Sequence, residues 1–78
     1  MTLKHADKYK QLGLNISFYR KAAGMTQIQL AEQADISRTY LSNIEAPNVT
    51  ISFTTTVLFN ISDALGVELN KLFTSQKM

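Results

Sequence analysis

The stretch that decides the fold is Thr26–Glu45, with the sequence TQIQLAEQADISRTYLSNIE. Its first residue, Thr26, is followed three positions later by Gln29, which is the spacing of a capping box. In a capping box each side chain bonds the backbone N–H of the other residue, and the pair marks the start of a helix. The pattern therefore predicts a helix over residues 27–34.

A second helix follows after a tight turn. Ser37 is a good N-cap and predicts a helix over residues 38–45. Asp35 separates the two helices, and Asp tolerates the left-handed backbone that a tight turn can require. At about 100° per residue, one side of the second helix is apolar, and the other carries the hydrogen-bonding side chains Arg38, Thr39, Ser42 and Asn43. The small Ala31 is expected to let the second helix approach the first closely. The apolar contact between the two helices is expected to comprise Leu30, Ala34, Ile36, Leu41 and Ile44.

The chain before this stretch predicts one long helix over about residues 7–23, which Gly24 ends. Most of the basic residues lie here: Lys4, Lys8, Lys10, Arg20 and Lys21. On charge alone, the preferred interpretation is a solvated helix face. Arg20 differs from the others because it falls on the apolar stripe, where a charge needs a partner.

Two further helices are expected after residue 45. Ser52 is expected to cap the first of them and Gly66 to end it, with an apolar face of Phe53, Val57, Leu58, Ile61, Ala64 and Leu65. The run 54–57 is β-branched and has a strand-like composition, but a strand there would have no pairing partner. A short helix over 68–73 carries Leu69, Leu72 and Phe73. The expected fold class is all-α, a compact five-helix domain.

Composition sets limits on function. The 78 residues fit one domain, and 45% hydrophobic with 18% charged residues is ordinary for a folded chain. The chain has no cysteine and one histidine, so neither a metal site nor a cofactor is expected. No apolar run approaches membrane-spanning length, so a cytoplasmic protein is expected. The chain holds no nucleophile–base pair and no phosphate-cradling Gly loop, which argues against an enzyme. A net charge of +2 permits binding to a polyanion but does not argue for it.

Many spaced positions together resemble the phage-repressor or Cro-like helix-turn-helix family, also called XRE-type. They are Leu12-Gly13, Ile16, Arg20, Gly24-Met25-Thr26-Gln27, Leu30-Ala31, Ala34, Ile36-Ser37, Tyr40-Leu41-Ser42, Ile44-Glu45, Ile51-Ser52-Phe53 and Ile61–Val67. The resemblance implies a repressor-like domain over residues 12–73, with an extension over 1–11 that leads into the first helix and a tail over 74–78. The run 38–42 is also similar to the controller proteins of restriction–modification systems.

The resemblance also implies roles for single residues. Arg38, Thr39 and Asn43 match base-reading positions, with Ser42 beside them; Arg suits guanine and Asn suits adenine. Gln27 matches a position that bonds a DNA phosphate. Tyr40 lies near the edge of the core face, where packing, a phosphate contact or both are open. Residues 46–53 contain no Lys or Arg, although relatives often have phosphate-binding cations there. Two outcomes are open: either the affinity for DNA is lower than is typical of the family, or the neutral donors Asn48, Thr50 and Ser52 contact phosphates instead. Arg20 and Glu45 match an internal salt bridge.

The resemblance implies a sequence-specific, DNA-binding transcriptional regulator, and the kind of regulator expected first is a repressor. It would bind palindromic double-stranded DNA as a homodimer. The interface is expected to come from the last two helices and their apolar residues Leu58, Leu69, Leu72 and Phe73, some of which must also close the core. The alternative is a protein-interaction module with a protein partner, such as an antitoxin of a toxin–antitoxin pair or a coactivator-like adaptor. Sparse positive charge favours this alternative.

Overall fold

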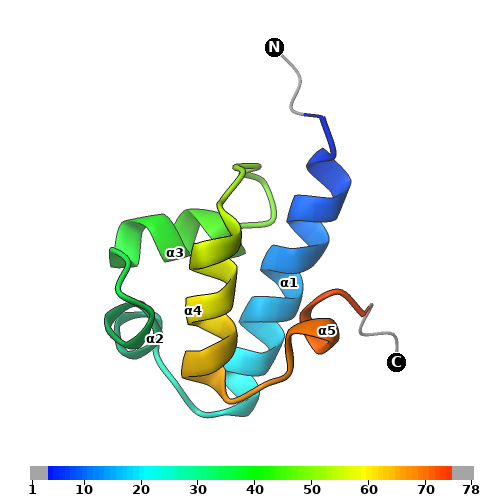
Figure 1. Ribbon diagram of the computed structural model, residues 1–78. Helices are drawn as coiled ribbons and strands as arrows, with labels where there is room; N and C mark the ends of the chain where they lie inside the picture. Colours follow the sequence, from blue (N-terminus) through cyan, green and yellow to red (C-terminus); the bar gives the residue numbers. More distant parts are fainter. Residues whose placement is uncertain (1–3, 75–78) are drawn as a thin grey trace.

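The computed structural model describes residues 4–74 and is all-helical over that range (Figure 1). The five helices are α1 (Ala6–Ala22), α2 (Gln27–Ala34), α3 (Arg38–Glu45), α4 (Thr55–Leu65) and α5 (Leu69–Leu72). The expected all-α, five-helix fold class is confirmed.

Helices α2 and α3 have the bounds that their caps predict. Thr26 Oγ1 accepts from the Gln29 N–H at 3.1 Å and Gln29 Oε1 accepts from the Thr26 N–H at 2.8 Å, which completes the capping box. Ser37 Oγ accepts from the Tyr40 N–H at 3.0 Å. Asp35 ends α2 with a φ of 58°, the left-handed conformation that lets the chain turn toward α3.

The expected start of α4 is wrong. Thr54, not Ser52, is its N-cap, because Thr54 Oγ1 accepts from the Val57 N–H at 3.3 Å. The β-branched residues after Thr54 are helical, and Leu58, one turn further along, lies in the core. Smaller differences affect two other helices: α1 begins and ends one residue earlier than expected, and α5 is shorter by one residue at each end.

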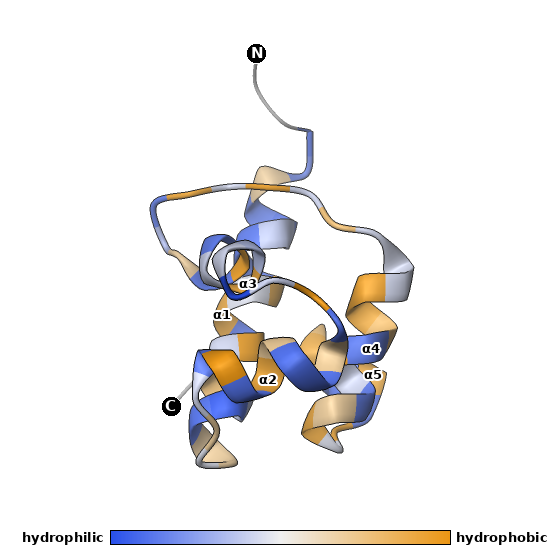
Figure 2. Ribbon diagram, turned by 90° about the vertical axis from the view of Figure 1, so that its left-hand side faces the viewer, coloured by the Kyte–Doolittle hydropathy of each residue, from blue (hydrophilic) through white to orange (hydrophobic). Residues whose placement is uncertain are grey.

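The core lies where α1, α2, α3 and α4 meet, and α5 covers one end of it. Its buried members are Leu12, Ile16, Leu30, Ala31, Ala34, Leu41, Ile44, Leu58, Ile61 and Leu72. Figure 2 shows both hydrophilic and hydrophobic residues along α2, because only one side of that helix faces this core. Of the four apolar residues expected at a dimer interface or in the core, Leu58 and Leu72 belong to the core, whereas Phe73 is 58% exposed.

Two residues of α1 fix its neighbours in ways that the sequence pattern does not indicate. Gly13 is buried against the C-terminal end of α3, where a Cβ atom would overlap the carbonyl oxygen of Ile44. Asn15 is 1% exposed, and its Nδ2 donates to the carbonyl oxygens of Leu72 at 2.7 Å and Thr74 at 2.9 Å. These bonds satisfy carbonyls at the end of α5 and hold that short helix against α1.

Candidate nucleic-acid interface

Helix α3 presents a polar face on a firmly packed base. Leu41 and Ile44 are buried, while Arg38 and Thr39 at the start of the helix are exposed. Ser42 and Asn43 are half-buried, and they lie one turn further along the same helix. The structure thus brings together the four residues that the sequence pattern selects for base reading. Such a face can donate and accept hydrogen bonds, and its packed underside holds it in one orientation.

The N-terminal end of α2 lies next to the C-terminal end of α3. Gln27 is the first residue of α2, where backbone N–H groups have no partner within the helix and the helix dipole favours an anion. Its side chain is half-buried, and its Nε2 donates to Glu45 Oε1 at 3.1 Å. The sequence pattern does not indicate this bond, because the two residues are 18 positions apart and on different helices.

Arg20 and Glu45 form an ion pair beneath this junction. Arg20 Nε donates to Glu45 Oε2 at 2.9 Å and Arg20 Nη2 donates to Glu45 Oε1 at 3.0 Å, a two-pronged geometry. Arg20 Nη1 donates to the Met25 carbonyl at 2.8 Å. The two side chains are only 11% and 4% exposed, so the pair joins α1 to α3 inside the protein. A charge that α1 carries into the interior is thereby neutralised.

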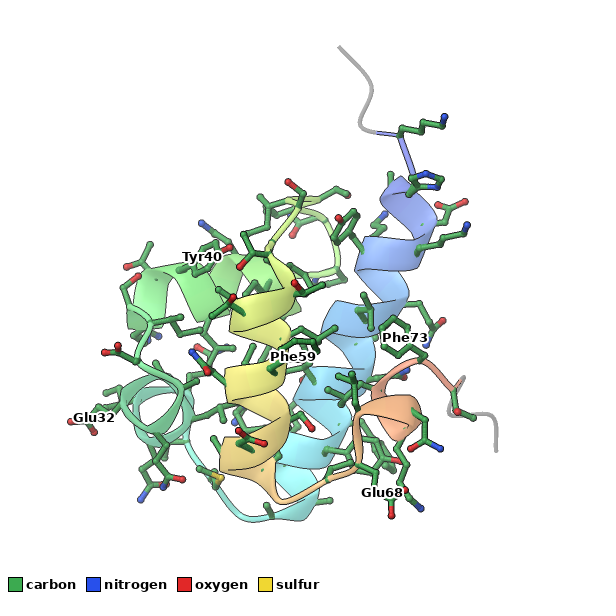
Figure 3. The ribbon with its side chains drawn as sticks, viewed as in Figure 1. Glu32, Tyr40, Phe59, Glu68 and Phe73 are labelled. Atoms are coloured by element: carbon green, nitrogen blue, oxygen red, sulfur yellow. The ribbon has the colours of Figure 1, made fainter. Side chains whose placement is uncertain are left out.

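The loop between α3 and α4 runs above α3 in Figure 2. Asn48 and Ser52 are exposed in it, and Thr50 is half-buried. Tyr40, labelled on α3 in Figure 3, is half-buried and packs against the core, so packing is at least part of its role. The loop itself carries no cation, and Arg38 is the only Lys or Arg on α2 or α3.

Within residues 4–74, no three His, Cys, Asp or Glu side chains lie close enough to hold a metal ion. In the same range, no helix is both long and apolar enough to cross a membrane.

Comparison with known proteins places the chain within a protein family. A family model described as Helix-turn-helix matches residues 16–72, most of the chain and all of α2, α3, α4 and α5. The resemblance stated from the sequence is thereby confirmed.

A curated relative agrees with this match. The immunity repressor protein of Bacillus phage phi105 is 38% identical over 61 residues, which are 78% of this chain and 41% of the repressor. The chain thus spans less than half the length of this relative.

Two solved structures are also similar. The restriction-modification controller protein C.AhdI from Aeromonas hydrophila superposes with a TM-score of 0.78 at 22% identity, over 86% of this chain and 98% of that one. The nucleoprotein complex C.Esp1396I matches with a TM-score of 0.71 at 28% identity, over 87% of this chain and 95% of that one. The first of these likenesses concerns the fold alone.

Proposed function

The chain belongs to the helix-turn-helix family, and from that premise we propose that it is a sequence-specific, DNA-binding transcriptional regulator that acts as a repressor. The phage immunity repressor among its relatives supports the repressor role. In this proposal the protein binds DNA without catalysing a reaction, and it does so in the cytoplasm.

The observation that carries the proposal is the polar face of α3. A helix fits the DNA major groove when one side packs on the protein and the other offers hydrogen-bonding groups to base edges. With Leu41 and Ile44 buried, Arg38, Thr39, Ser42 and Asn43 are available for that contact. Gln27, Tyr40, Asn48, Thr50 and Ser52 are proposed to bind phosphates around it, which would fix the position of α3 in the groove.

A homodimer on a palindromic operator is part of the same proposal. One recognition helix covers few base pairs, and two helices related by a two-fold axis read two half-sites about 34 Å apart. Large apolar side chains on α4 and after α5 support an interface there: Phe59 is 49% exposed on the front of α4, and Phe73 lies beside α1 (Figure 3). The half-buried Leu69 on α5 adds apolar surface.

Base-reading and phosphate-binding residues should respond differently to substitution. Arg38→Ala and Asn43→Ala should each weaken binding to the best operator by about 1–3 kcal/mol and relax preference at one base pair in each half-site. Gln27→Ala should weaken binding to all DNA sequences equally. Because Gln is uncharged, the substitution should leave the salt dependence of DNA affinity nearly unchanged. Titrations against the operator and its single-base variants measure both effects.

The matched control is Gln33→Ala, an exposed glutamine on α2 outside the proposed interface, which should bind like the wild type. If Arg38→Ala and Asn43→Ala keep full base preference, α3 does not read the DNA.

The second candidate function is a protein-interaction module, such as an antitoxin or a coactivator-like adaptor. The cation-free loop after α3 and the exposed Phe59 and Phe73 favour it. Failure to bind any DNA at low salt would replace the first proposal with this one.

A further inference from the structure

We propose that Glu45 is a positioning residue for DNA binding: it orients the side-chain amide of Gln27 before the DNA arrives. The inference rests on the proposed function, because it concerns the phosphate contact assigned to Gln27. It gives Glu45 a second role beside its ion pair with Arg20, and it joins three helices in one hydrogen-bonded unit.

Glu45 Oε1 accepts hydrogen bonds from two different helices. This oxygen accepts from Arg20 Nη2 at 3.0 Å and from Gln27 Nε2 at 3.1 Å. A carboxylate only accepts hydrogen bonds, so the Gln27 amide must turn its NH2 group, not its oxygen, toward Glu45. The bond therefore selects one of the two orientations that a free glutamine amide takes equally well.

The Gln27 amide has a second N–H group that Glu45 does not use. Nε2 carries two N–H groups, and Glu45 uses one of them. Among residues 4–74 no other hydrogen-bond partner of the Gln27 side chain is found, and this side chain is only half-buried at the positive end of α2. The second N–H is thus available to a phosphate oxygen at a place where backbone N–H groups also favour an anion.

Conformational entropy explains why this orientation should raise affinity. A free glutamine loses side-chain freedom on binding, and that loss opposes complex formation. Glu45 holds Gln27 in place in the free protein, so the loss occurs on folding instead. Because Arg20 neutralises the carboxylate, Glu45 can do so without repelling the DNA backbone.

The test is a double-mutant cycle on operator affinity, with Arg20→Met/Glu45→Met as the second background. This background removes both charges together, and such replacement of a buried pair by apolar residues is often tolerated. We expect Gln27→Ala to weaken binding about tenfold in the wild type, as for a hydrogen bond to a charged group, and only about twofold in the Met/Met background. Arg38→Ala is the control, and it should lower operator affinity by the same factor in both backgrounds.

If Gln27→Ala lowers operator affinity by the same factor in the two backgrounds, the inference is overturned and the proposed function still stands. A wild-type protein that binds no DNA would overturn the proposed function itself.

If the Met/Met background does not fold, NMR of the wild type decides. We expect the Gln27 side-chain amide protons of the free protein to exchange slowly with solvent and to show contacts to the Glu45 or Arg20 side chain, and we expect DNA to shift mainly the proton not bonded to Glu45. Gln27 amide protons that exchange rapidly with solvent and show no contact to Glu45 or Arg20 in the free protein would overturn the inference.

Discussion

Glu45→Ala should lower the free energy of unfolding by about 3–5 kcal/mol, because it leaves the guanidinium of Arg20 buried without its partner. Both side chains are nearly inaccessible to water, so solvent cannot replace the lost carboxylate. Gln27 also loses the acceptor of its side-chain bond. Stabilities of small domains are commonly about 5–15 kcal/mol, so the variant should lose a large part of the total. Urea denaturation followed by circular dichroism measures the change.

The control for this prediction is Arg20→Met/Glu45→Met, in which no unpaired charge remains. It should be clearly more stable than Glu45→Ala, although it still lacks the bond from Arg20 to the Met25 carbonyl. A Glu45→Ala protein that unfolds at the wild-type urea concentration would show that the pair does not join α1 to α3 in solution.

Gly13→Ala should cost about 3 kcal/mol, at the upper end of what overpacking usually costs. The added Cβ would overlap the Ile44 carbonyl oxygen, and backbone atoms cannot rotate away as the end of a side chain can. α1 would have to move from the end of α3, which would disturb the adjacent Arg20–Glu45 pair as well. The loss should exceed the gain of nearly 1 kcal/mol that alanine brings to a helix over glycine.

Ser17→Ala, one turn further along α1 at a half-buried position, is the matched control, and it should change stability by less than about 0.5 kcal/mol. If Gly13→Ala is as stable as Ser17→Ala in the same urea titration, the close approach of the two helices is not required.

Local signals in the sequence account for the parts of the fold that were predicted correctly. The capping box at Thr26 and the N-cap at Ser37 are contacts within four residues, so they set the starts of α2 and α3 without reference to the rest of the chain. The start of α4 was missed because Ser52 and Thr54 are both acceptable caps by type. In the structure the hydroxyl of Thr54 accepts from the Val57 N–H, which is the bond that an N-cap makes.

Contacts between distant residues were not predictable in this way. The bonds from Asn15 to Leu72 and Thr74 span 57 and 59 positions, and an asparagine within a helical pattern usually reads as a surface residue. The bond between Gln27 and Glu45 also depends on how helices meet in space. For the candidate site, helical spacing alone separates the polar face of α3 from its buried side, while the contacts of that face with DNA remain predictions.

The central claim is that α3 reads DNA sequence as one of a symmetric pair, and selection of bound sites from random double-stranded DNA tests it most directly. The account predicts enrichment of one palindromic site whose half-site centres lie about 34 Å apart, bound by two chains. Recovery of a single, non-repeated site bound by one chain, or no enrichment of any sequence, would contradict it.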